Sequence, residues 1–357
     1  MPENTSLKSY QYEALLAHAI DLFRAAGLSE EKARGVAWVL VEADLIGHTT
    51  HGLALVPTYL DALRQGTMAR TGEPEILADS GACMAWRGNK LPGGWLTLKA
   101  VDMCIARAAT HGVVTCAIAG GHHIGALAVY MKRATDLGLM AMVASSTPSA
   151  KGVAPHGGTQ SLFTPNPLAA GIPTDSDPIV LDISASITTL NQAKQLDKAG
   201  QKFPNRWAID AKGMPTDDPA IVVSQGGTLL PVGGIDHGHK GYSMALLVEA
   251  MTQGLSGVGR ADAPTGTYTS VFIQVLDPAA FAGGAAYTRQ TSWLAQACRE
   301  NPPRPGVDSV RVPGDRAALH RREALRVGVP LSQAIVANLE QASTRLGLAP
   351  PVPIGGA

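Results

Sequence analysis

Hydrophobic residues in this chain change their spacing twice, and this change restricts the fold more than any other feature. Both ends carry apolar residues at helical spacing, at 8–27, 29–45 and after Pro57 near the start and at 316–346 near the end. The middle instead carries short, solid apolar runs that are typical of buried strands. We therefore expect helices from the two ends to pack together beside a middle part of strands and helices.

The middle alternates between predicted strands and predicted helices. The strands are expected at 113–120, 139–146, 167–173, 178–184 and 270–277, and the helices at 96–110, 124–138 and 241–257. No predicted strand is followed by the GxGxxG fingerprint of the Rossmann fold, so a classical dinucleotide-binding domain is not indicated. The Pro- and Gly-rich end, residues 351–357, is expected to be loose.

Composition excludes several classes of protein. The 357 residues are 45% hydrophobic, and Lys+Arg equals Asp+Glu at 29 each, so no basic excess is present to hold a nucleic acid or an anionic membrane. No apolar stretch reaches the ~18 residues that span a bilayer, and the N-terminus lacks a signal-peptide pattern. The four cysteines are scattered and form no CxxC pair, as expected of a cytoplasmic protein with reduced thiols.

Two histidines, His48 and His51, stand three residues apart in the apolar stretch 45–60. Histidines in such surroundings are most often packed residues. Metal ligation would need a third ligand, and the chain has no HExxH or CxxC motif to supply one. Proton transfer is the third interpretation, because imidazole titrates near neutral pH. The pattern alone leaves packing, metal binding and acid–base chemistry open.

Three further stretches place polar residues beside glycines or at the end of a strand. At 120–127, Gly-Gly-His-His separates a predicted strand from a predicted helix, where ligands often bind at the end of a sheet. At 229–247, a glycine-rich loop with His239 and Lys240 opens a helix and suits an anion such as a phosphate. Asp182 ends an apolar strand, where a carboxylate is costly to bury unpaired; it could cap a segment, pair with a histidine or hold a substrate.

In this order, these stretches resemble the malate/L-lactate dehydrogenase family that lacks a Rossmann fold. Its relatives include ureidoglycolate dehydrogenase, 2,3-diketogulonate reductase, sulfolactate dehydrogenase and the piperideine- and pyrroline-2-carboxylate reductases. The resemblance runs from about residue 10 to about residue 345. The matching motifs are Thr50-His51-Gly52, His122-His123-Ile124-Gly125-Ala126, Pro155-His156-Gly157-Gly158, Pro165-Asn166-Pro167, Leu181-Asp182-Ile183-Ser184-Ala185-Ser186 and Gly238-His239-Lys240-Gly241-Tyr242.

The resemblance implies an α+β fold with two domains. Residues 1–80 with 316–350 would form a helical domain, and residues 81–315 a non-Rossmann α/β domain that binds NAD or NADP on a mixed, largely antiparallel sheet. The protein would act as a homodimer on a small molecule. The implied reaction interconverts a 2-oxo acid, or a cyclic or related 2-imino acid, with its 2-hydroxy or amino acid.

The resemblance also implies roles for individual residues. His51 would be the proton donor and acceptor with Thr50 beside it, Asp182 would adjoin the nicotinamide and the substrate, and His123 would line the substrate side. These roles agree with the chemistry, because hydride addition to a carbonyl builds negative charge on oxygen, and no metal is required. The cofactor would be held by Ser146, Pro178, Ile179, Val180, Leu181, Asp182, Ile183, Ser184, His239, Lys240, Gly314, Asp315 and Arg316.

One position departs from the family pattern. Where many members carry an arginine that grips the substrate carboxylate, this chain has Leu55, which cannot make the bidentate contact. Either another cation replaces the arginine, with Arg87 and Lys90 as the first candidates, or the substrate is not a simple 2-oxo acid.

Two rival functions follow from the same residues. The Leu55 change favours a catalytically inactive nucleotide-binding protein of the same fold. The histidines also permit a metal-dependent hydrolase or lyase, which would use His48, His51, His122 and His123.

Overall fold

A seven-stranded mixed sheet forms the centre of the protein, in a computed structural model that describes residues 7–355. The strand order is β2-β3-β4-β11-β5-β6-β7; β3 and β4 run parallel, and the other neighbouring pairs are antiparallel. The strands are β2 (Glu75–Asp79), β3 (Cys83–Arg87), β4 (Val113–Gly121), β5 (Met140–Ser146), β6 (Pro167–Ile172), β7 (Ile179–Ser184) and β11 (Thr269–Leu276). The predicted mixed, largely antiparallel sheet is confirmed.

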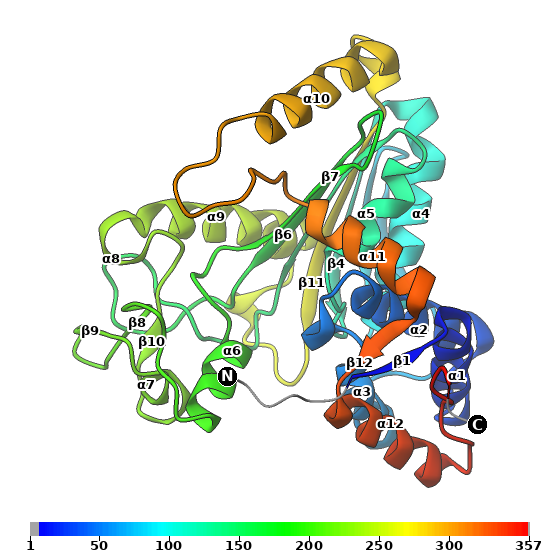
Figure 1. The fold of residues 1–357 in the computed structure, drawn as a ribbon, viewed down its shortest axis with the longest axis horizontal. Helices are drawn as coiled ribbons and strands as arrows, with labels where there is room; N and C mark the ends of the chain where they lie inside the picture. The colour runs from blue at the N-terminus through cyan, green and yellow to red at the C-terminus, as the bar shows by residue number, and fades with distance from the viewer. Residues whose placement is uncertain (1–6, 356–357) are drawn as a thin grey trace.

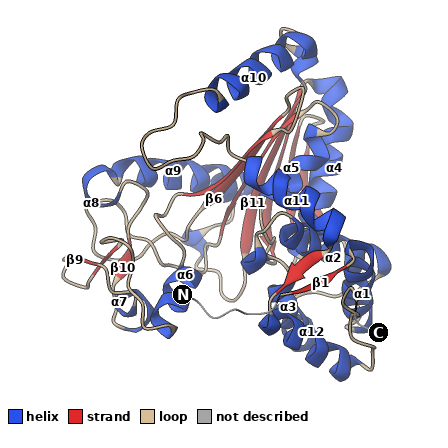
Figure 2. Ribbon diagram, viewed as in Figure 1, coloured by secondary structure: helices blue, strands red, loops and turns tan. Residues whose placement is uncertain are grey.

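Helices pack against this sheet (Figure 2). The helix α4 (Gly93–His111) packs on β4 and β11, and α5 (Ala128–Thr135) packs on β5 and β6. Elsewhere, α9 (His239–Glu249) contacts β5 and continues into a π-helical turn, Ala250–Gly254. No helix in the described part of the chain is long and apolar enough to cross a membrane.

The two ends of the chain meet in a small antiparallel sheet of β1 (Lys8–Tyr10) and β12 (Val329–Leu331). Around it lie α1 (Tyr12–Ala25), α2 (Glu30–Leu45), α3 (Val56–Gln65) and α12 (Gln333–Leu346), which Figure 1 shows together in blue and red at the lower right. One hydrophobic core joins these helices to the sheet: it includes Val36 and Leu40 of α2 and Ile118 and Ile273 of the strands. The division into two domains at residues 80 and 316 stays a prediction, and residues 1–6 lie outside the described residues.

A second part of the molecule is formed by the chain between β5 and β6 and by the chain between β7 and α9. It has its own small core of Val153, Phe163, Phe203 and Leu229. It contains the sheet β10-β8-β9 and three short helices, at the left of Figure 1. Its elements are α6 (Leu190–Lys198), β8 (Ala208–Ile209), β9 (Pro215–Thr216), α7 (Ala220–Ser224), β10 (Thr228–Leu229) and α8 (Gly234–His237). Two further helices, α10 (Gly284–Arg299) and α11 (Asp315–Val327), follow β11.

Several predicted elements have different limits in the structure. The helix predicted from residue 8 begins at Tyr12, because 8–10 pair with β12. The helix predicted at 316–346 is divided into α11 and α12 by β12, after Gly328 takes a positive φ of 102°. The predicted helix 124–138 is shorter, since residues 122–127 form a loop before α5. In the tail, the Ile354 N–H donates to the Ser9 carbonyl at 2.8 Å; the looseness of 351–357 stays a prediction, and 356–357 lie outside the described residues.

Candidate active site

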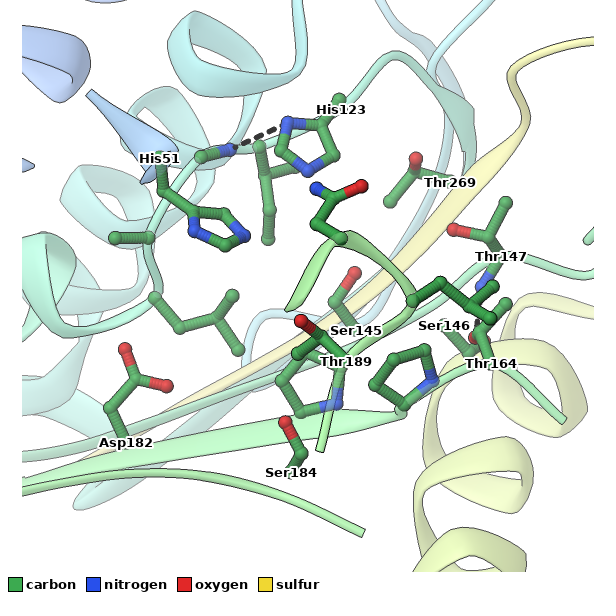
Figure 3. Close-up of a pocket in the computed structure, with 18 of the residues that line it drawn as sticks. His51, His123, Ser145, Ser146, Thr147, Thr164, Asp182, Ser184, Thr189 and Thr269 are labelled. Carbon is green, nitrogen blue, oxygen red and sulfur yellow. Dashed lines mark hydrogen bonds between the residues drawn. The ribbon is translucent and has the colours of Figure 1, made fainter. Parts of the chain in front are cut away.

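A cavity of about 350 Å³ lies where the turn after α2 approaches the ends of the sheet strands. Figure 3 shows His51 and His123 side by side at one end of it, Asp182 on one wall, and hydroxyl side chains along the rest. Its polar lining consists of His48, His51, His123, Ser145, Ser146, Thr147, Thr164, Asp182, Ser184, Thr189, Asn191 and Thr269. The cavity therefore gathers three of the four predicted catalytic residues, His51, His123 and Asp182, from three separate parts of the chain.

His51 stands in a single 3₁₀ turn, Thr49–His51, that follows α2. The Thr50 hydroxyl lies 2.9 Å from His51 Nδ1, so Thr50 contacts the imidazole directly. Burial lowers the pKa of His51; the nearby Asp182 carboxylate opposes this effect and His48 adds to it. His51 is thus held largely as a neutral imidazole at neutral pH, able to accept a proton.

A buried carboxyl, Asp44, holds the turn that carries His51. Its side chain is 0% exposed, and its Oδ2 accepts the N–H of Leu53 at 2.6 Å. A Cβ at Gly52 would come within 2.3 Å of the same oxygen, so the turn can pass this close only with glycine there. Burial raises the pKa of Asp44 to about 7, while the Leu53 hydrogen bond opposes it.

His123 lies in the loop between β4 and α5, and its ring stacks on that of His51 with centroids 5.9 Å apart. Its Nδ1 lies 2.7 Å from the Tyr59 hydroxyl and accepts the N–H of Gly125 at 3.3 Å, the bond drawn in Figure 3. Burial, together with the neighbouring His51 and His122, lowers the pKa of His123 to about 3. His123 is therefore a neutral side chain at physiological pH.

Asp182 reaches the cavity because alternate residues of β7 face opposite sides of the sheet. Val180, Asp182 and Ser184 lie on one face, whereas Ile179 and Leu181 pack into a separate small core with Val312. The Asp182 Oδ2 accepts the Ala128 N–H at the start of α5 at 2.9 Å and lies 3.8 Å from His48 Nδ1. Burial raises its pKa, opposed by this N–H and by His48 and His51.

A second cavity, of about 280 Å³, lies along the same face of β7. Pro178 and Val180 line it, with Gly314 at the start of α11 and Ala128 of α5. Gly314 has a φ of 102°, and a Cβ there would lie 2.9 Å from the Val180 nitrogen, so glycine allows the helix start to approach the strand. Two separate cavities thus lie along one face of β7, the first lined by Asp182 and Ser184 and the second by Pro178 and Val180.

The remaining predicted cofactor residues do not line these cavities among the described residues. His239 and Lys240 are exposed at the start of α9. Asp315 is bound by Arg299 at 2.7 Å and accepts the Val312 N–H at 2.9 Å, which makes it part of the α11 start. Of the others, Arg316 and Ile183 are exposed. Ile179 and Leu181 point away from the cavities, into the small core on the other face of β7.

The two cations considered as replacements for the missing arginine lie elsewhere. Arg87 pairs with Glu75 at 2.8 Å on the edge strands, and Lys90 is exposed in the loop after β3. Leu55 packs against the main core. Among the described residues that line the first cavity, none is lysine or arginine.

The arrangement of the histidines bears on the metal alternative. His122 is 3% exposed and packs edge-on against Tyr59 with ring centroids 5.6 Å apart, rather than joining the cavity. Within residues 7–355, no group of three His, Cys, Asp or Glu side chains is arranged to hold a metal ion.

Sequence reasoning did not single out Tyr59, Asp44 or Thr189. Tyr59 and Asp44 sit at apolar helical positions, and nothing in their local sequence indicates what lies across the core from them. Thr189 carried a detectable signal in the sequence, because threonine is a favoured residue at the start of a helix. In the structure its side chain accepts the Gln192 N–H as the N-cap of α6.

Comparison with known proteins gives the chain a family. A family model described as malate/L-lactate dehydrogenase matches residues 10–340. The chain is 31% identical over 341 residues to an L-lactate dehydrogenase of Cupriavidus necator, covering 93% of this chain and 96% of the relative. It is 32% identical over 316 residues to a (2R)-3-sulfolactate dehydrogenase (NADP(+)) of Chromohalobacter salexigens, covering 85% and 89%.

An imine reductase and a solved structure extend the comparison. A Δ1-pyrroline-2-carboxylate/Δ1-piperideine-2-carboxylate reductase of Pseudomonas syringae is 29% identical over 347 residues, covering 94% of this chain and 96% of the relative. The fold matches the crystal structure of malate dehydrogenase from Entamoeba histolytica with a TM-score of 0.90 at 22% identity, covering 97% of this chain and all of that chain (100%). The predicted family and enzyme class are both confirmed: the chain belongs to the malate/L-lactate dehydrogenase family and is an oxidoreductase.

Proposed function

We propose that this enzyme uses NAD or NADP to interconvert a 2-oxo acid, or a cyclic or related 2-imino acid, with its 2-hydroxy or amino acid. The observation that carries the proposal is the convergence of His51, His123 and Asp182 on one cavity. The lactate and sulfolactate dehydrogenases among the relatives support the oxo-acid class of substrate, and the imine reductase supports the imino-acid class.

His51 is the proton-transfer residue in this proposal. When a hydroxyl is oxidised, the neutral imidazole accepts its proton; in reduction, the protonated imidazole returns a proton to the oxygen or nitrogen that gains negative charge. Thr50, 2.9 Å from Nδ1, orients the ring, and Asp182 favours the protonated form electrostatically. The nicotinamide, when bound, supplies or takes up the hydride.

The cofactor would be held along β7. Val180, Asp182 and Ser184 face the two cavities, with Ser146 at the first cavity and Gly314 at the second. Lys240 and His239 would contribute a charged helix start from α9. A homodimer in the cytoplasm is part of the proposal. One relative's name specifies NADP, and this chain's choice between NAD and NADP is left to the assay.

The test follows the absorbance of reduced nicotinamide. NADH and NADPH would each be paired with pyruvate, oxaloacetate, longer 2-oxo acids, a diketo sugar acid and cyclic imine acids. We expect turnover of at least one pair, and His51→Gln to reduce kcat by ~10²–10⁴-fold with nearly unchanged cofactor affinity. His111→Gln, at the exposed end of α4, is the matched control.

Three outcomes would count against the proposal in different ways. Retention of more than about a tenth of the rate in His51→Gln would contradict the role of His51, given the usual contribution of acid–base catalysis. Cofactor binding with no turnover of any substrate would favour the inactive nucleotide-binding protein. Absence of cofactor binding would reject the nicotinamide assignment altogether.

A further inference from the structure

We propose that Tyr59 and the Gly125 N–H fix His123 as a single neutral tautomer with its proton on Nε2. In this form His123 donates a hydrogen bond to the reacting oxygen or nitrogen, while His51 alone transfers the proton. Tyr59 is then a positioning residue that acts through His123. The role in the reaction rests on the proposed function, whereas the tautomer itself does not.

The hydrogen bond from Gly125 determines which ring nitrogen of His123 is unprotonated. The Gly125 N–H donates to His123 Nδ1 at 3.3 Å. A backbone N–H can only donate, so Nδ1 must present a lone pair and cannot carry a proton. In a neutral imidazole the proton then lies on Nε2.

Tyr59 strengthens the same assignment. Its hydroxyl lies 2.7 Å from Nδ1 and 3.3 Å from the His123 carbonyl, and it has one proton to give. Because Nδ1 is already an acceptor, the shorter contact is a donation from Tyr59 to Nδ1. Tyr59 is 3% exposed and burial raises its pKa, so the hydroxyl keeps its proton. Two donors on one ring nitrogen leave the other nitrogen free for a ligand.

The surroundings of His123 oppose the charged imidazolium. The titratable groups near it are His51, His122 and Tyr59, and both histidines act, with burial, to lower the pKa of His123 to about 3. Protonation at Nδ1 would also break both hydrogen bonds described above. His51 differs, because the Asp182 carboxylate counteracts its burial. Two adjacent imidazoles with environments this different are suited to different roles.

A neutral donor suits the second role. Nδ1 of His123 faces the loop, and the ring lines the cavity beside His51 (Figure 3). An N–H aimed at a carbonyl oxygen stabilises the charge that develops there as hydride is added, without giving up its own proton. The proton that completes the hydroxyl comes from His51, so the step balances with one proton and one hydride.

The first measurement is an NMR spectrum of the protein labelled with ¹⁵N in its histidines. The chain has 10 histidines, and the His123 signals are identified by their loss in His123→Gln. We expect Nε2 protonated and Nδ1 unprotonated at every pH from 5 to 9. A proton on Nδ1, or a titration of His123 within that range, would overturn the inference even in the absence of any turnover.

The second measurement compares two matched variants. Tyr59→Phe removes a donor from Nδ1 and should alter the His123 ¹⁵N signals and reduce kcat about tenfold, below the ~10²–10³ of a direct oxyanion donor. Tyr130→Phe removes a hydroxyl that is equally buried and donates to the Ile124 carbonyl of the same loop, and it should leave the His123 signals unchanged. If the two variants behave alike, Tyr59 does not position His123. An intact tautomer in a protein that turns over no substrate would reject the donor role and the proposed function, while the assignment of the proton would stand.

Discussion

Replacing the buried Asp44 carboxyl with an amide should make the protein more stable at high pH than at low pH, relative to wild type. Asp44 is 0% exposed, its Oδ2 has one donor, and its Oδ1 has no hydrogen-bond partner among the described residues. Burial raises its pKa from the ordinary value of 3.8 to about 7. The folded protein therefore holds a proton on Asp44 between about pH 4 and 7 that the unfolded chain has lost.

The sign follows from proton linkage. A raised pKa in the folded state gives stability that is fully present below the unfolded value and is lost as pH rises through the folded value. A separation of about three pH units at 1.36 kcal/mol per unit corresponds to about 4 kcal/mol. Asp44→Asn has no charge to bury at any pH. Its unfolding free energy minus that of wild type should thus rise by up to about 4 kcal/mol between pH 4 and 8.

The assay is denaturant unfolding of wild type and Asp44→Asn at fixed pH values from 4.5 to 8.5. The absolute difference also contains a cost of about 1–3 kcal/mol for an unpaired amide N–H, which does not vary with pH. The slope against pH is therefore the result to judge. Asp102→Asn is the control, because its exposed carboxylate pairs with Arg133 and its loss should cost no more than about 1 kcal/mol. A flat difference between pH 5 and 8 would refute the buried, protonated carboxyl.

Two further substitutions test the geometry around His51. Gly52→Ala would place a Cβ 2.3 Å from the Asp44 carboxyl, so it should lower the unfolding free energy by about 1–3 kcal/mol and reduce kcat, whereas Gly284→Ala, with open space around it, should do neither. Equal unfolding transitions for the two alanine variants would contradict the close approach. Asp182→Asn keeps an acceptor for the α5 start but removes the charge that raises the pKa of His51. The limb of the kcat/KM pH profile that reports His51 should therefore move to lower pH. A limb that stays in place would show that the Asp182 charge does not affect the pKa of His51.

Local signals were enough to predict much of the secondary structure. The helix expected at 29–45 is α2, which has Ser29 as its N-cap, accepting the Lys32 N–H, and ends at Leu45. The runs at 113–120 and 139–146 are strands within a residue or so of their predicted limits, because strands buried on both faces are apolar throughout. These elements depend on side chains that are neighbours in the sequence.

Elements that depend on distant partners were not predictable in this way. The strand Lys8–Tyr10 is three residues long and forms only against Val329–Leu331 near the other end of the chain. The hairpin strand β2 is exposed at all five of its residues, so no apolar alternation marks it. The helix α10 exposes Trp293 and Leu294 and buries only Ala295, so its hydrophobic pattern has no clear inner face.

The candidate site combines both kinds of information. His51, His123 and Asp182 could be singled out because glycines, strand ends and helix starts mark them locally. What gives these residues different chemistry comes from partners that no local pattern indicates: the Asp182 carboxylate near His51, the Tyr59 hydroxyl on His123 Nδ1, and the Ala128 N–H on Asp182.

A consequence is that the substitution at Leu55 cannot be interpreted from the motif alone. The cavity's described lining contains no lysine or arginine, and the pKa values of His51 and His123 in that lining are lowered. An acid substrate would then meet neutral donors, chiefly hydroxyls and N–H groups, in place of a bidentate cation. Neutral donors hold a carboxylate less tightly than arginine does, so the substrate panel should give a weaker preference for charged over uncharged carbonyl compounds than an arginine at this position would impose. Comparing pyruvate with its methyl ester in that panel measures this preference directly, and a strong discrimination against the ester would mean that a cation reaches the cavity from outside its present lining.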